Sequence, residues 1–240
     1  WLFVVLTLVW LGSFALFPDL FFCVGVNHLG VWFLDTFAIL ASNDALSRGL
    51  DPFAPNALDY LHRPHVYSHW WLHLRDLGLT RAHNLWVGLA LVLAFLAVAL
   101  ARLRPRVPGE LLWYGVVFLS SPVLLALDRA NNDLVVFILL AAVVPCLTSP
   151  RRPVRFLAAV PIAVAAGLKF YPAIAGLVLL AAPDARELRG RLLIAVGLLA
   201  IVGLSVAPDL ARFGGLVPRA DGLTSFGAVN LLEAAGLGGW

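Results

Sequence analysis

The chain has 240 residues, of which 61% are hydrophobic and only 13% are charged, and its net charge is +3. With a mean hydropathy of +0.91, this composition excludes an ordinary soluble domain and is typical of an integral membrane protein. The arginines cluster in short loops between apolar runs, which argues against a nucleic-acid partner. Because the chain contains no Met and begins within an apolar run, we expect residues 1–240 to be a single transmembrane domain of a longer protein.

The apolar residues fall into six runs, several of them shorter than the roughly 20 residues that a straight membrane span requires. The runs cover residues 1–26, 84–101, 111–127, 134–148, 156–182 and 192–207. We therefore expect an all-α, polytopic transmembrane protein with some thinned or partly buried helices. Cys23 and Cys146 both lie in apolar runs, where a thiol behaves as a small hydrophobic side chain rather than a metal ligand.

Between the first two runs lies a long polar segment, residues 28–82, and arginine clusters follow the second, fourth and fifth runs. Short cytoplasmic loops collect Arg and Lys, so the first two clusters are expected in the cytoplasm and residues 28–82 and 128–133 outside. A single crossing by residues 156–182 would leave the third cluster outside. The clusters are Arg102, Arg104 and Arg106; Arg151, Arg152 and Arg155; and Arg186, Arg189 and Arg191.

A third arginine cluster outside would conflict with the preference of arginine for cytoplasmic loops. The stretch LKFYP, residues 168–172, suggests a different path for the chain. Pro172 cannot continue a helix, and it disfavours helical dihedrals at Tyr171. We therefore expect residues 156–182 to form a broken hairpin that enters from and returns to the cytoplasm, with Lys169 at its tip. A lysine at that depth costs about 3 kcal/mol on insertion scales. Lys169 is thus expected either to pair with an acidic neighbour or snorkel, or to bind an anionic ligand in an outward-facing cavity.

Four segments would then meet on the outer face: residues 28–82, DRANND at 128–133, the hairpin tip, and TSFGAVN at 224–230. In DRANND, Asn132 and Asp133 are candidates both for capping the following helix and for contacting substrate. Arg129 carries a planar guanidinium suited to phosphate, and Asp128 is its alternative partner.

Within residues 28–82, the sequence predicts an amphipathic helix over 31–47 that lies at the membrane interface and ends before Gly49. Asp35 interrupts its dense apolar stretch VWFLDTFAIL. A carboxylate partly desolvated in this way suits proton abstraction, so Asp35 is the candidate base. Asp44 is the runner-up, because it lies one turn from Arg48 and is expected to form an ordinary ion pair.

The stretch HRPHVYSHWWLHL spaces His65, His69 and His73 four residues apart, so that one helical face could carry all three. Such spacing occurs in metal sites. Its aromatic neighbours, however, are those expected at a membrane interface. We therefore expect interface packing or substrate contact here rather than a metal, with Arg63, His65 and Tyr67 as the contacting residues.

These segments resemble GT-C class membrane glycosyltransferases, particularly glycosyltransferase family 87, which use polyprenyl-phosphate sugars as donors. The resemblance extends along the whole chain through three short motifs. DRANNDLVVFILL is similar to an R-G-N/Q-x-x-L segment, with Ala130 where Gly is usual, and GLKFYPAIAGLVLL is similar to an LK-aromatic-P helix break. An acid followed by small residues and a G-x-x-P-aromatic turn is matched by Asp35, Ala41, Ala45, Gly49, Pro52 and Phe53.

The resemblance implies transfer of a sugar, mannose-like or arabinose-like, from a polyprenyl phosphate to a lipid-linked or glycan acceptor. It places the enzyme in the plasma (inner) membrane among membrane lipids, with the active site on the extracytoplasmic side. Asp35 would be the base, Lys169 and Arg129 would bind phosphate, and Tyr171, Asn132 and Asp133 would be further substrate contacts. No metal or other cofactor is expected, because arginine and lysine supply the positive charge.

Three other classes compete with this interpretation. A transporter or flippase would also place a lysine in a broken helix, although it should show two similar halves and the sequence shows no internal repeat. A glycan ligase or polymerase would share the large outer loop and would need a diphosphate donor. A non-catalytic scaffold would tolerate the loss of Asp35.

Overall fold

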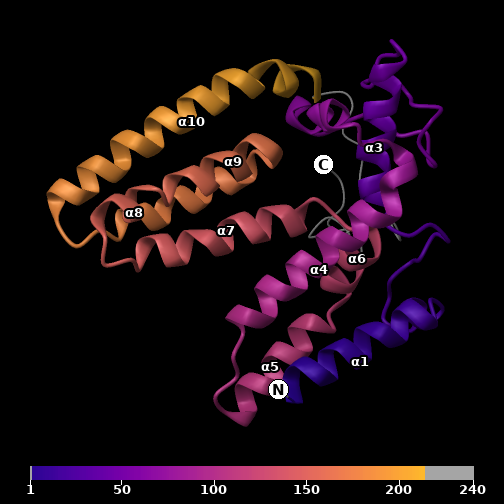
Figure 1. The fold of residues 1–240 in the computed structure, drawn as a ribbon, viewed down its shortest axis with the longest axis horizontal. Coiled ribbons are helices and arrows are strands. Elements are labelled where there is room, and N and C mark those ends of the chain that lie inside the picture. The colour runs from indigo at the N-terminus through magenta and orange to yellow at the C-terminus, as the bar shows by residue number, and fades with distance from the viewer. Residues whose placement is uncertain (1, 214–240) are drawn as a thin grey trace, which may run out of the picture.

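The computed structural model describes residues 2–213, and the regular secondary structure of this part is entirely helical (Figure 1). The α-helices are α1 (Leu2–Leu16), α2 (Leu20–Cys23), α3 (Leu34–Ser47), α4 (Asn84–Arg102), α5 (Pro108–Phe118), α6 (Ser121–Arg129), α7 (Asp133–Leu147), α8 (Arg152–Phe156), α9 (Ala159–Lys169) and α10 (Ala185–Phe213). Three 3₁₀ helices join them: η1 (His69–Leu77), η2 (Arg81–His83) and η3 (Tyr171–Leu180). The predicted all-α class is confirmed for the described residues.

The helices pack around two main apolar cores that α7 connects. In the first core, Phe118 of α5 and Leu134 of α7 pack with apolar residues of α1, α4 and α6. In the second, Val143 of α7 packs with apolar residues of α9, η3 and α10. Helix α7 therefore holds the two groups of helices together, since its first half packs in one core and its second half in the other (Figure 1).

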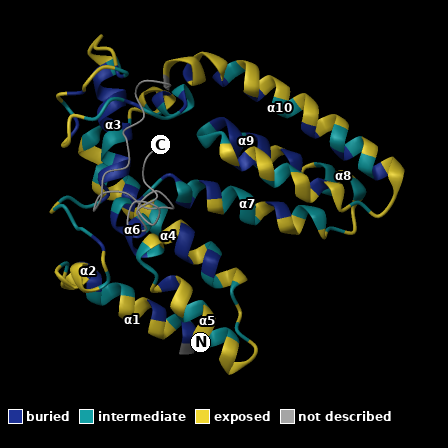
Figure 2. Cartoon of the chain, turned by 180° about the vertical axis from the view of Figure 1, so that it is seen from behind, coloured by how far each residue is buried: buried dark blue, intermediate teal, exposed yellow. Residues whose placement is uncertain are grey.

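Two helices of the described part are long and apolar enough to cross a membrane, 81–102 and 185–212. Helices α5 and α6 make a third candidate span if they are counted together, although they meet at a bend of 52°. The predicted runs 1–26 and 111–127 are thus each divided between two helices. Along α10, exposed residues such as Leu193, Ile201 and Leu204 form an apolar outer face (Figure 2), as expected for contact with lipid.

The predicted broken hairpin is confirmed as a structural element. Helix α9 ends at Lys169, and Phe170 has φ of 58° and ψ of −58°, which reverses the chain before η3 begins. Leu179, near the end of η3, packs in the same core as Ala158 and Ala159 at the start of α9. The two halves therefore run side by side in opposite directions, with Lys169 at the turn.

Helix α3 differs from its prediction. It begins at Leu34 rather than at residue 31, and it ends before Gly49 as predicted, where φ is +73°. Ten of its 14 residues are buried within the protein, which differs from the exposed faces expected of an amphipathic surface helix, and its position at the membrane interface stays a prediction. The reason is tertiary: η1, α4 and α6 all pack against α3 and cover its polar as well as its apolar faces.

The ends that carry the arginine clusters lie far from α3 (Figure 1). The C-terminal ends of α4 and α7 and the start of α10 point away from it, to the left of the view. At that end, Glu187 of α10 accepts hydrogen bonds from Arg155 and Arg191. This buried carboxylate connects the segment around α8 to α10. Because Arg155 belongs to the second arginine cluster and Arg191 to the third, both clusters also have a structural role.

Candidate active site

The site forms where three separate segments meet: the start of α3, the turn between α6 and α7, and the hairpin tip. Two hydrogen bonds join the first two, because Phe33 N donates to the Asp128 carbonyl and Thr36 Oγ1 to the Ala130 carbonyl, each at 2.8 Å. Ala130 itself has φ of +42°. That conformation favours glycine, which gives a physical reason for the Gly usual at this position of the resembled motif.

Asp35 lies in the first turn of α3 and is only 5% exposed. Asn131 Nδ2 donates to its Oδ2 at 2.6 Å, and Arg63 Nη1 approaches its Oδ1 at 3.3 Å. The helix N-terminus adds partial positive charge. These contacts hold the Asp35 carboxylate in one orientation at the start of α3.

Arg63 is held by a residue that sequence analysis did not select. Asp59 is 2% exposed and accepts from Arg63 Nε at 2.9 Å and from Nη2 at 3.0 Å. Nη2 also donates to the Leu34 carbonyl. The predicted role of Arg63 as a substrate contact remains a prediction; in the structure it fixes the start of α3. The four-residue spacing of Asp59 and Arg63 was the only local signal for this pair.

Lys169 reaches the same place from the hairpin tip. Its Nζ donates to Asp133 Oδ1 at 2.7 Å and lies 3.4 Å from Asn131 Oδ1. Tyr171 donates its hydroxyl to the same Asp133 oxygen at 2.6 Å. Of the two interpretations of Lys169, the structure thus shows the pairing with an acidic neighbour. The Asp133 side chain is 47% exposed, so this pair borders open space.

Asn131 is the residue that brings the site together, and sequence analysis did not select it. Its amide nitrogen donates to Asp35 and its oxygen lies near Lys169. The same oxygen accepts from Asp133 N at 2.8 Å, which is the helix-capping contact expected of Asn132 or Asp133. Asn132 does occupy the N-cap position of α7, but its side chain makes no capping bond. The only sequence signal for this role of Asn131 was that RANND contains a second asparagine beside Asn132.

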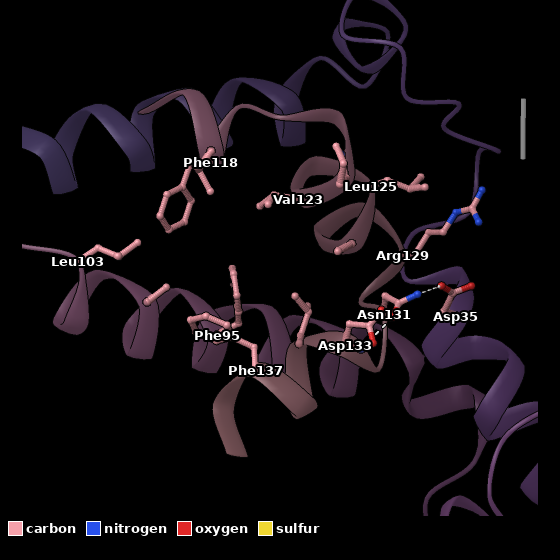
Figure 3. Close-up of a pocket in the computed structure, with 15 residues that line it drawn as sticks. Asp35, Phe95, Leu103, Phe118, Val123, Leu125, Arg129, Asn131, Asp133 and Phe137 are labelled. Carbon is pink, nitrogen blue, oxygen red and sulfur yellow. Dashed lines mark hydrogen bonds between the residues drawn. The ribbon is translucent and has the colours of Figure 1, made fainter. Parts of the chain in front are cut away.

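Arg129 extends from the last turn of α6 at the polar end of a cavity, close to Asp35 and Asn131 (Figure 3). Its Nε is buried and has no hydrogen-bond acceptor among the described residues. Its alternative partner, Asp128, instead binds His28 Nδ1 at 2.6 Å. A buried guanidinium nitrogen without an acceptor is suited to an anionic ligand.

The cavity has a volume of about 500 Å³ and runs between α4 on one side and α5 and α6 on the other (Figure 3). Its polar end is formed by Asp35, Arg129, Asn131 and Asp133. The remaining walls are apolar and consist of Phe95, Ala99, Leu103, Val117, Phe118, Pro122, Val123, Leu125, Ala126, Leu134 and Phe137. Such a shape suits a ligand with a charged head and a long hydrocarbon chain.

Tyr67 lies near Asp35, and His65 contacts Tyr67. Burial and the nearby negative charge of Asp35 raise the pKa of Tyr67, which also interacts with Asn132. Burial lowers the pKa of His65 to about 4, and its ring packs against Phe53 and Tyr67. Neither residue lines the cavity. Their predicted contact with substrate therefore stays a prediction.

The predicted helical face of three histidines is wrong, because η1 begins at His69 and His65 precedes it. His69 binds Asp209 of α10 at 2.8 Å, and His73 binds Asp76 at 2.8 Å. The histidines thus have separate partners. Residues 2–213 contain no group of three or more His, Cys, Asp or Glu side chains arranged to hold a metal.

Asp44 is buried in α3, and its predicted pairing with Arg48 is wrong. Its carboxylate lies 3.4 Å from Arg81 Nε instead, since η2, which begins with Arg81, packs against α3. Asp44 does not line the cavity. The segment TSFGAVN, residues 224–230, lies outside the described residues.

The fold and the site define a class: a helical membrane protein with an apolar cavity whose polar end carries two carboxylates, an amide and one arginine, with Lys169 bound to one of the carboxylates. The model of glycosyltransferase family 87 matches residues 69–237, and the chain belongs to that family and is a glycosyltransferase. The match confirms the resemblance. It includes Arg129, Asn131, Asp133 and Lys169 but not Asp35. No curated protein and no solved structure matched the chain.

Proposed function

We propose that this glycosyltransferase moves a sugar from a polyprenyl-phosphate donor to a lipid-linked or glycan acceptor at the outer face of the membrane. The observation that carries the proposal is the double contact of Asn131. One amide group binds Asp35 and lies beside Lys169, so a candidate base and a candidate phosphate-binding cation share one site.

The cavity supports a lipid-linked donor. Its apolar walls would cover part of a prenyl chain, which passes from lipid to these walls without desolvating a polar group and is held there by van der Waals packing. At its polar end, Arg129 would bind the phosphate. Lys169 would exchange its contact with Asp133 for the phosphate, which is feasible because the Asp133 side chain is 47% exposed. The sugar would then lie beside Asp35.

In the reaction, the acceptor hydroxyl oxygen forms a bond to the anomeric carbon of the sugar while the bond from that carbon to the phosphate oxygen breaks. Asp35 takes the proton of the acceptor hydroxyl. The polyprenyl phosphate leaves with one more negative charge, which Lys169 and Arg129 stabilise. Asn131 and Arg63 hold the carboxylate of Asp35 toward the cavity.

Asp35→Asn tests the base. It preserves shape and loses the ability to take a proton, so turnover should fall by at least about 10²-fold while donor binding persists. Asp44→Asn is the matched control on the same helix, and its turnover should remain near that of the unaltered enzyme. Loss of activity in Asp44→Asn with full activity in Asp35→Asn would transfer the role to Asp44, and full activity in both would refute a base on α3.

The donor is tested directly by incubating membranes that contain the protein with radiolabelled polyprenyl-phosphate sugars, one sugar at a time. Transfer of label from a mannose or arabinose donor to lipid-linked or glycan products is the expected result. Transfer from a diphosphate donor alone would show instead that the protein is a ligase or polymerase.

A further inference from the structure

The break in the hairpin leaves carbonyl groups in the last turn of α9 without an intrahelical donor, and that of Leu168 is one of them. In an α-helix the Leu168 carbonyl would accept the N–H of the residue four positions later, and that residue is Pro172, which has none. An unpaired carbonyl inside a protein costs free energy comparable to a lost hydrogen bond. Trp71 supplies the missing donor from another part of the chain, because its Nε1–H binds the Leu168 carbonyl at 3.2 Å.

Trp70 packs against the residue before Leu168, which is Gly167. Its ring lies so close to Gly167 that a Cβ there would come within 2.3 Å of Trp70 Cζ3. The Trp70 Nε1–H donates to Ser205 Oγ of α10 at 3.0 Å. Trp70 and Trp71, which are neighbours in η1, thus contact the two residues that precede Lys169. Trp70 packs against Gly167, which has no side chain, and Trp71 donates a hydrogen bond to the Leu168 carbonyl.

The tryptophans are in turn attached to the helix that carries Asp35. Asn43 of α3 is fully buried, and its Nδ2 donates to the Trp71 carbonyl at 3.0 Å. Its Oδ1 accepts from Arg75 N at 2.8 Å. A continuous set of contacts therefore leads from α3 through η1 to the residue next to Lys169.

We propose that Trp71 is a positioning residue: by replacing the donor that Pro172 lacks, it sets where the hairpin tip holds Lys169 relative to Asp35. The inference rests on the proposed function only in that Lys169 binds the donor phosphate. The position of Lys169 itself can be measured without any substrate.

Lys169 is the only lysine in the chain, so an amine-reactive ester followed by mass spectrometry of its peptide reports on this tip alone. In the protein purified in nanodiscs, Trp71→Phe keeps an aromatic ring and removes the N–H. Lys169 should then be labelled roughly fivefold faster, as expected for the loss of one hydrogen bond to the partly buried Leu168 carbonyl. Trp86→Phe is the matched control, because Trp86 is 69% exposed, and it should leave the labelling rate unchanged.

An unchanged labelling rate in Trp71→Phe would overturn the proposal. If that variant does not yield folded protein, benzothienylalanine at position 71, which has nearly the shape of tryptophan without the N–H, is judged by the same rates. In the enzyme assay, the donor KM should rise several-fold more than kcat falls. Faster labelling with an unchanged donor KM would keep Trp71 as the residue that positions the tip and would refute phosphate binding by Lys169, so the two failures are distinguishable.

Discussion

Asn131 shows how a single side chain can define a site. Its amide can donate and accept at once, and here it donates to Asp35 while its oxygen lies near Lys169. The carboxylate and the ammonium therefore stay in one site without pairing with each other. Lys169 pairs instead with Asp133, and the Asp35 carboxylate is held by Asn131 and Arg63.

Lys169→Gln should weaken donor binding more than acceptor binding. The loss of one charged hydrogen bond to phosphate corresponds to about a 10- to 100-fold rise in donor KM, with a much smaller change in acceptor KM. Lys169→Arg keeps the charge and should recover part of the loss. Steady-state kinetics with each substrate varied in turn provides the measurement, and an unchanged donor KM in Lys169→Gln would assign the residue to structure.

His65 should make the protein sensitive to acid. Its pKa is lowered from 6.5 to about 4, mainly by burial, with His69 acting in the same direction and the Ser68 carbonyl and Asp209 opposing it. The unfolded chain therefore binds a proton at a higher pH than the folded protein does. The contribution of neutral His65 to the free energy of unfolding is fully present above pH 6.5, and the free energy of unfolding should fall by about 3 kcal/mol as the pH drops toward 4.

Thermal unfolding in detergent at a series of pH values between 7 and 4 measures this effect. His65→Gln cannot take up the proton, so its unfolding temperature should depend less steeply on pH than that of the unaltered protein. Identical slopes for both would show that His65 does not contribute to acid sensitivity.

At the scale of elements, the approach of η1 to α9 depends on one missing side chain. Gly167→Ala would place a Cβ within 2.3 Å of the Trp70 ring. The ring would have to move, and overpacking of this kind costs about 1–3 kcal/mol. We therefore expect a lower unfolding temperature together with faster labelling of Lys169.

Gly197→Ala is the control for that substitution. It lies within α10, and a Cβ there meets nothing within 4 Å. Alanine favours a helix over glycine by about 1 kcal/mol, so the unfolding temperature should stay equal or rise. If both substitutions changed stability equally, the close contact between Trp70 and Gly167 would not be significant.

At the scale of the whole molecule, the arginine-bearing helix ends lie far from α3 (Figure 1). This arrangement agrees with the proposed orientation, in which the arginines lie in the cytoplasm and the site faces outward. Leu61 is a suitable reporter of the outer loop because it is 45% exposed, whereas Asp59 is buried against Arg63.

Single cysteines at Leu61 and Arg104 should therefore react differently with an impermeant thiol reagent, in a variant that lacks Cys23 and Cys146. In intact cells Leu61→Cys should be labelled, and Arg104→Cys should be labelled only after the membrane is permeabilised. Labelling of both from outside would contradict the orientation.

The sequence by itself determined the features that depend on near neighbours or on composition. Hydropathy indicated the membrane class. Pro172 predicted the break in the hairpin because it has no backbone N–H with which to continue its helix. Gly49 predicted the end of α3, and its φ is positive in the structure. The family, too, was recognisable from motifs that are each contained in one short segment.

Only the tertiary structure decided which charged groups pair. Asp44 binds Arg81 rather than Arg48, and His69 binds Asp209, 140 residues away. Ion pairs depend on distance in space and on burial, so no local pattern separates these partners from others of equal charge. The same holds for Asn131, which acquires its place between Asp35 and Lys169 only when the α6–α7 turn, α3 and the hairpin tip are packed together.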